Sequence, residues 1–76
     1  MAVISLDRLS AGEIGAIQYL DGGRGLISRL AALGFTPGAK VTIVQNFGRG
    51  PVIVEVRHAR IALGRGEAQK VMVKRK

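Results

Sequence analysis

The chain has 76 residues, no cysteine and a formal net charge of +7 at pH 7. A chain of this length is expected to form a single domain with a small core, here residues 1–76. The absence of cysteine excludes disulfides and thiolate metal sites, so aliphatic packing has to stabilise the fold. The basic charge favours an acidic protein surface, nucleic acid or anionic lipid as a partner, without choosing among them.

The sequence shows no segment for membrane insertion or export. No apolar run approaches the ~20 residues of a membrane span, and the first residues lack the basic start and apolar core of a signal peptide. The one dense basic run, Lys74-Arg75-Lys76, is typical of a solvated tail. We therefore expect a cytoplasmic protein.

The first twenty residues predict a short helical turn followed by a strand. The Ser5 hydroxyl can accept a free backbone N–H, so Ser5 is expected to cap a turn that includes Asp7 and Leu9. Residues 13–20 are interpreted as the first strand. Gly15 lies near its start and predicts a bend or a close approach of another backbone.

One amphipathic helix is predicted over residues 25–33. Leu26, Leu30 and Leu33 recur there at spacings of four and three residues, which places them on one face. Gly34 is expected to end the helix as a left-handed C-cap, with Phe35 making the apolar contact of a Schellman ending. Residues 36–39, Thr-Pro-Gly-Ala, predict a type II turn.

The second half of the chain predicts four further strands. Their expected ranges are 40–46, 52–56, 60–63 and 69–73. The second and third of these form a hairpin whose tip is Arg57-His58-Ala59. The predicted fold class is therefore mainly β: a small antiparallel barrel of about five strands, with one helix and a short N-terminal helical turn.

The tripeptide Gly-Arg-Gly occurs three times, at residues 23–25, 48–50 and 64–66. Glycine reaches positive φ without steric cost, so each copy is predicted to reverse the chain and to hold its arginine outward.

The residues with catalytic or metal-binding chemistry are few and scattered. His58 is the single histidine, and the five carboxylates occur one at a time in predicted turns and strands. A nucleophilic mechanism needs a histidine beside a nucleophile, and a metal site needs several converging ligands. We therefore expect no enzyme activity, no cofactor and no resident metal.

The order of turn glycines and core aliphatic residues resembles the FeoA family, the small ferrous iron transport proteins A. The more specific matching segments are Leu33-Gly34-Phe35-Thr36-Pro37-Gly38 and Ala62-Leu63-Gly64-Arg65-Gly66-Glu67-Ala68. The resemblance covers nearly the whole chain and implies an SH3-like barrel. It also implies a partner, the FeoB membrane transporter with its cytosolic GTP-binding region, through which the protein would lie at the inner face of the membrane.

One segment departs from the family pattern. Arg57-His58-Ala59 stands at the hairpin tip, where glycine or small polar residues are expected, so the tip is predicted to be longer or less tightly turned.

The resemblance makes an accessory protein of ferrous iron uptake the first hypothesis, acting on the transporter by protein contact. Phe47 is the expected interface anchor, since it lies with Arg49 in a glycine-rich loop; the alternative is that Phe47 plugs one end of the barrel. Arg24, Arg29 and Arg65 are expected to contact an acidic partner surface, and Leu26 belongs either to the contact or to the core.

A basic barrel that binds nucleic acid is the alternative hypothesis. It accounts for the charge, but single-strand binders present several aromatic stacking groups, and this chain has only Tyr19, Phe35 and Phe47. Pairing of exposed strand edges into a homo-oligomer is compatible with either hypothesis.

Overall fold

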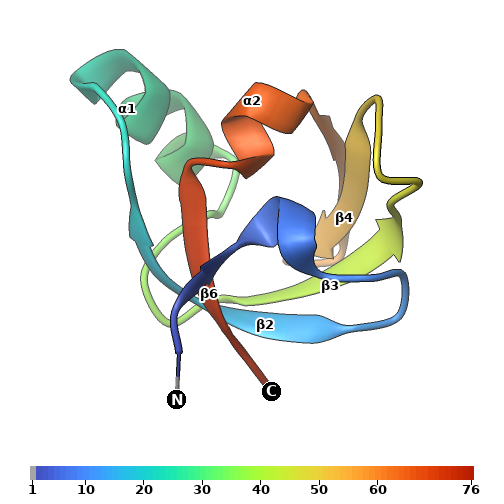
Figure 1. Cartoon of the computed structure of the whole chain (residues 1–76). Coiled ribbons are helices and arrows are strands. Elements are labelled where there is room, and N and C mark those ends of the chain that lie inside the picture. Colours follow the sequence, from blue (N-terminus) through green and yellow to red (C-terminus); the bar gives the residue numbers. More distant parts are fainter. Residues whose placement is uncertain (1) are drawn as a thin grey trace.

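The protein folds as one six-stranded antiparallel sheet that curls into a small barrel, with α1 and α2 gathered at one end (Figure 1). The computed structural model describes residues 2–76. The strands are β1 (Ile4–Ser5), β2 (Ile14–Leu20), β3 (Lys40–Gln45), β4 (Val52–Val56), β5 (Ala59–Leu63) and β6 (Val71–Arg75), in the spatial order β1-β6-β2-β3-β4-β5. The helical elements are the 3-10 turn η1 (Leu6–Arg8), α1 (Arg24–Ala32) and α2 (Arg65–Ala68).

Alternate strand residues point inward and form one aliphatic core. In β4, Val52, Val54 and Val56 are buried, whereas Ile53 and Glu55 between them are only half-buried. The other core residues are Leu6, Leu9, Ile17, Leu30, Phe35, Val41, Ile43, Leu63, Ala68, Val71 and Val73. Full burial of an aliphatic side chain contributes about 1.5–3 kcal/mol, so this core is the main source of stability.

Gly15 lies where β2 passes close to two other parts of the chain, as the sequence predicts. A Cβ at this position would lie 3.1 Å from Leu9 Cδ1 and 3.2 Å from Val73 Cβ. Any larger residue would therefore push β2 away from β6 and from the segment after η1.

The end of α1 follows the predicted Schellman geometry. Gly34 has φ of +103°, its N–H donates to Ala31 O at 3.0 Å, and the Phe35 N–H donates to Leu30 O at 3.0 Å. The type II turn is also confirmed, since Gly38 has φ of +88° and the Ala39 N–H donates to Thr36 O at 2.9 Å.

Two elements were not predicted, and several predicted boundaries differ from the observed ones by one or two residues. The sheet has six strands rather than about five, because the two-residue β1 pairs with β6 and is too short to show a period. The second helix, α2, contains a glycine, which lowers helix propensity. It forms because Glu67 accepts the Gly64 N–H at 3.1 Å and Ala68 is buried. The helix α1 covers residues 24–32, one residue earlier than predicted, and the last strand covers 71–75 rather than 69–73. Ser5 is at the N-cap of η1, but its side chain makes no capping hydrogen bond.

Only the middle Gly-Arg-Gly copy reverses the chain as predicted. Gly48 and Gly50 have φ of +84° and +72°. Gly23 and Gly64 instead have φ of −74° and −58° and are the N-caps of α1 and α2. A glycine before an arginine therefore marks a helix start in two places here.

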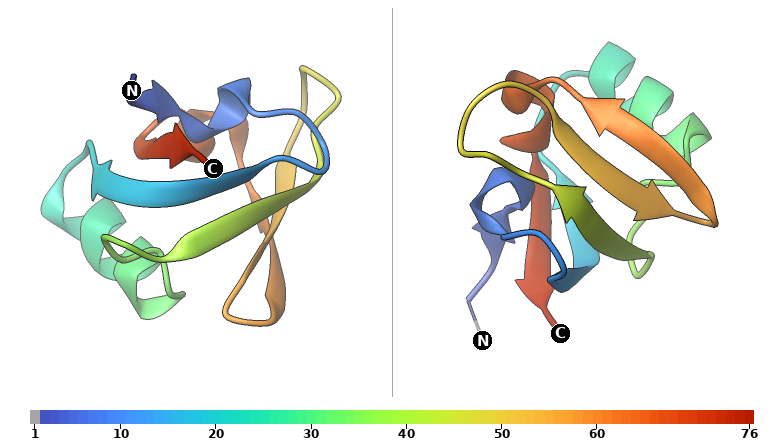
Figure 2. Two further views of the ribbon diagram at one scale, coloured as in Figure 1. Left: turned by 90° about the horizontal axis from the view of Figure 1, so that it is seen from below. Right: turned by 90° about the vertical axis from the view of Figure 1, so that its right-hand side faces the viewer.

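The tip of the β4–β5 hairpin is tighter than predicted. Val56 pairs with Ala59, so the turn consists of Arg57 and His58 alone. Their φ angles are +51° and +67°, the left-handed region that glycine or asparagine normally supplies and that costs other residues about 1 kcal/mol or more each. The Arg57 Nη2 donates to Thr36 Oγ1 at 3.1 Å, which fastens the tip to the segment after α1. Figure 2 shows the hairpin tip beside the end of α1.

We expect Gly34→Ala to lower the free energy of unfolding more than Gly38→Ala. Both substitutions force alanine into a left-handed conformation, at about 1–2 kcal/mol. A Cβ at Gly34 would additionally lie 2.8 Å from Arg57 Cδ, whereas a Cβ at Gly38 meets no atom within 4 Å. Urea unfolding of both variants measures the difference, and equal losses would contradict a packed Arg57.

The Glu13 carboxylate joins the start of β2 to the end of β6. Its Oε1 accepts the Ser10 N–H at 2.8 Å and its Oε2 accepts Arg75 Nε at 2.9 Å. The backbone hydrogen bond from Ser10, followed by the hydrogen bond from Arg75, lowers the pKa of Glu13 from 4.5.

The lowered pKa of Glu13 predicts an acid-dependent contribution to stability. Because the folded state favours the ionised carboxylate, the contribution is complete above the ordinary pKa of 4.5 and is lost as the pH falls through the lowered value. Urea unfolding of wild type and Glu13→Gln at pH 6 and pH 3 should therefore show a stability difference that shrinks at the lower pH. A difference that stays constant would show that the ionised carboxylate has no special role.

Candidate functional site

Three chain segments lie at one end of the barrel, which we call the helical end: α1 on one side, α2 in the middle and the loop of residues 46–51 on the other side (Figure 1). An ion pair between Arg29 and Glu67 joins α1 to α2. Hydrogen bonds from Arg65 join α2 to the loop. All the predicted partner-binding residues lie on these segments: Arg24, Leu26, Arg29, Phe47, Arg49 and Arg65.

Phe47 projects from the loop into solvent, with 77% of its surface exposed. It therefore does not plug the barrel. Of the two roles considered for Phe47, only a surface role agrees with its exposure.

Asn46 fixes the loop just before Phe47. Its Nδ2 donates to Asp7 O at 2.8 Å and to Leu9 O at 2.7 Å, and its Oδ1 accepts the Gly48 N–H at 3.0 Å. The last bond is an Asx turn, a conformation that asparagine commonly adopts. The sequence analysis did not single out Asn46, although an asparagine directly before Phe47 and Gly48 is a signal for such a turn.

Arg65 fixes the loop from the other side. Its Nε donates to Gly50 O at 3.0 Å and its Nη2 donates to Asn46 Oδ1 at 2.8 Å. The planar guanidinium is suited to such forked hydrogen bonding. Arg65 thus points back to the protein rather than outward as predicted, and it positions the segment that carries Phe47.

The other predicted residues differ in their exposure and in the contacts that they make. Arg24 and Arg49 are exposed. The Arg29 side chain remains 60% exposed although it pairs with Glu67. Leu26 is half-buried and packs against the core, and a Cβ at Gly22 would overlap it.

The helix α1 also exposes apolar surface at the helical end. Ile27 and Leu33 are 39% and 43% exposed. Leu33 was predicted to share the buried face with Leu26 and Leu30, but it is the C-cap, where the chain leaves the helical path.

Within residues 2–76, no three histidine, cysteine or acidic side chains come close enough to hold a metal ion. Over the same residues, no helix is both long and apolar enough to cross a membrane.

Comparison with known proteins gives a consistent set of relatives. The sequence model of the FeoA domain matches residues 4–75. A protein of Methanocaldococcus jannaschii named as a Fe(2+) transport protein A is 39% identical over 62 residues, which are 82% of this chain and 74% of that protein.

Two crystal structures show the same fold. An iron uptake regulatory protein, FeoA, superposes with a TM-score of 0.92 at 32% identity, covering 99% of this chain and 100% of that chain. Stenotrophomonas maltophilia FeoA complexed with zinc, described as an SH3 domain protein, gives 0.83 at 28% identity, covering 93% and 89%. The predicted SH3-like architecture is confirmed.

Replacing Arg65 with methionine should loosen the loop, because methionine keeps an unbranched apolar stem but carries no guanidinium. The variant loses the hydrogen bonds to Gly50 and Asn46, so the backbone order parameters of Phe47 and Gly48 should fall from about 0.85 to below about 0.6. We expect a loss of about 1 kcal/mol in the free energy of unfolding.

Nitrogen-15 relaxation measures the order parameters, and Arg49→Met serves as the matched control because Arg49 is exposed on the same loop. Unchanged order in Arg65→Met would show that Arg65 does not hold the loop.

Proposed function

Since the chain belongs to the FeoA domain family, we propose that it is an accessory protein of ferrous iron transport that binds a FeoB-type membrane transporter. The contact is made by the helical end, and the surface contacted is the cytosolic GTP-binding region of the transporter. The protein modulates uptake by this contact and neither carries iron nor hydrolyses GTP. The observation that carries the proposal is the exposed Phe47 on a braced loop.

Phe47 has the properties of an interface anchor. Large aromatic side chains dominate the binding free energy of many interfaces when they enter a pocket on the partner. Ordering a mobile loop on binding reduces affinity, but this loop is already held by Asn46 and Arg65. The side chain is thus presented in a fixed place before the partner arrives.

The arginines of the helical end favour an acidic partner surface. Arg24, Arg29 and Arg49 lie at the same end, and the whole chain carries a net charge of +7. Exposed charges of this kind mainly raise the association rate and fix orientation, whereas the buried anchor supplies affinity. Ile27 on α1 and Leu33 at its C-cap add exposed apolar surface on the α1 side of the helical end.

We expect Phe47→Ala to weaken binding to the isolated GTP-binding domain of the transporter by about 30-fold, which corresponds to about 2 kcal/mol. Isothermal titration calorimetry at physiological salt measures the affinity. The control is Tyr19→Ala, because Tyr19 is also aromatic and 50% exposed but lies on β2. An equal effect of the two substitutions would contradict Phe47 as the anchor.

A generic oligonucleotide titrated in parallel tests the nucleic-acid alternative. That hypothesis predicts binding that weakens by decades as salt rises, because counterions are released from the phosphates. The accessory-protein proposal predicts saturable binding to the GTP-binding domain and none to the oligonucleotide. Binding to the oligonucleotide alone would overturn it.

A further inference from the structure

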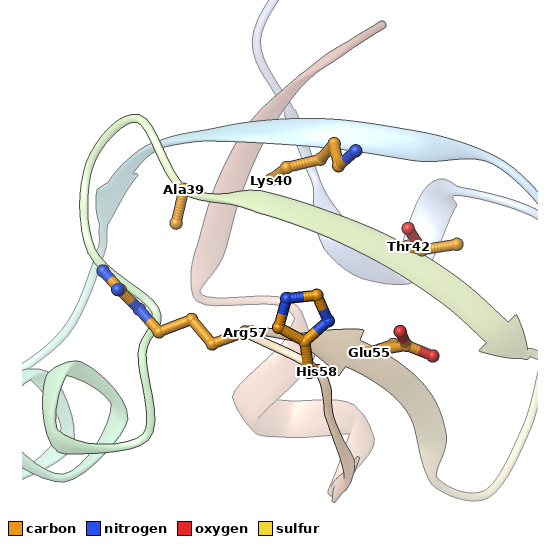
Figure 3. A pocket seen from close by; sticks show the side chains of 6 residues that line it. All are labelled: Ala39, Lys40, Thr42, Glu55, Arg57 and His58. Atoms are coloured by element: carbon orange, nitrogen blue, oxygen red, sulfur yellow. The ribbon is translucent and has the colours of Figure 1, made fainter.

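A second candidate site lies at the opposite end of β4 from the Phe47 loop. It is an open hollow of about 470 Å³ on the outer side of β3 and β4, beside the hairpin tip (Figure 3). Its lining residues are Ala39, Lys40, Thr42, Glu55, Arg57 and His58. The helical end contributes none of these, so the hollow is separate from the surface proposed to bind the transporter.

The hairpin tip beside the hollow contains the non-glycine residues of the structure that have positive φ, Arg57 and His58. An Asn-Gly pair would form this two-residue turn with less strain. Strained residues persist where their side chains are used. Arg57 has a structural use, since it bonds Thr36 and covers Gly34. His58 instead is exposed, and its ring stands over the hollow between Arg57 and Glu55 (Figure 3).

The charged side chains that line the hollow determine which class of ligand it can bind. Lys40, Arg57 and His58 offer cationic or N–H donor groups from β3 and the turn, and Thr42 adds a hydroxyl. The one carboxylate, Glu55, has Arg60 Nε 3.8 Å from its Oε1. These donors suit an oxyanion and repel a metal cation.

The size and the composition of the hollow favour a carboxylate on a peptide over a phosphate. A volume of about 470 Å³ exceeds that of one small anion and falls in the range of pockets that hold several groups of a ligand. Glu55 would repel a doubly charged phosphate more strongly than a single carboxylate. The lining holds no phenylalanine, tyrosine or tryptophan ring on which a nucleobase could stack.

We propose that this hollow binds a carboxylate side chain of an extended acidic peptide segment, with Lys40 and His58 as the principal donors. The strained backbone at His58 then persists because its side chain binds the ligand. Relieving it should stabilise the fold and weaken the site together, a combination that a purely structural residue would not produce.

The test uses fluorescein-labelled hexaglutamate as the probe and the labelled hexaglutamine peptide as the uncharged control. Fluorescence anisotropy at physiological salt gives the affinity, and amide chemical shifts of the nitrogen-15-labelled chain locate the site. We expect saturable binding of hexaglutamate alone, with shifts at Lys40, Thr42 and His58. Shifts confined to residues 46–51 or to α1 would overturn the proposal.

Lys40→Gln should weaken binding about tenfold, whereas the control Lys70→Gln, which removes the same charge from an exposed site outside the hollow, should change it less than twofold. Equal losses of affinity in the two variants would mean that net charge alone attracts the peptide, and would overturn the proposal. Displacement of the labelled hexaglutamate by inorganic phosphate at the same concentration would also overturn the choice of a carboxylate as the ligand.

His58→Gly separates binding from folding. Glycine accepts the left-handed turn, so the melting temperature should rise by about 4 °C while the affinity for hexaglutamate falls several-fold. A higher melting temperature with unchanged affinity would exclude His58 from the site.

Discussion

The guanidinium of Arg65 is the connection on which the presented surface depends. It donates to Asn46 Oδ1 and Gly50 O, and Asn46 in turn donates to the backbone carbonyls of Asp7, within η1, and Leu9, just after it. Arg65 therefore joins α2 to the loop of Phe47, and Asn46 joins that loop to the N-terminal segment. Without these bonds, a glycine-rich loop would hold its aromatic residue in many positions, and ordering that residue on binding would reduce affinity.

A second connection, through Arg57, joins the hairpin tip at the far end of β4 to the end of α1. Arg57 lies across Gly34 and binds Thr36, so the end of α1 and the hairpin tip fix each other. This connection uses strain in a two-residue turn, whereas the Arg65 connection uses unstrained hydrogen bonds. The helical end presents an exposed aromatic residue together with arginines, whereas the hollow beside the hairpin tip is lined by cationic donors without a large apolar side chain.

Much of the barrel could be predicted because its signals are local. The alternation of Val52, Val54 and Val56 with half-buried residues indicates a strand, and the sequence from Leu30 to Gly38 specifies the end of a helix and a turn. β1 could not be predicted, because a two-residue strand exists only through its partner β6. Nor could α2, whose glycine is tolerated because Glu67 caps it and Ala68 is buried.

The surface position of Phe47 and Arg49 could be predicted from residue type, but the structural role of Arg65 could not. Phe47 and Arg49 followed from an aromatic and an arginine in a glycine-rich loop, and the exposure of Phe47 agrees with a surface role. The inward course of Arg65 could not be read from the sequence, because its partners lie 15 and 19 residues away. The tight turn at Arg57 and His58 was missed because those residues do not favour it.

The proposed contact between the helical end and the transporter is tested most directly by titrating the nitrogen-15-labelled chain with the unlabelled GTP-binding domain of the transporter while amide chemical shifts are recorded. Binding at the helical end should produce shifts concentrated in residues 24–33, 46–51 and 65–68. Shifts confined to the hairpin tip and the adjoining β3–β4 surface, or no shifts at saturating domain, would contradict it.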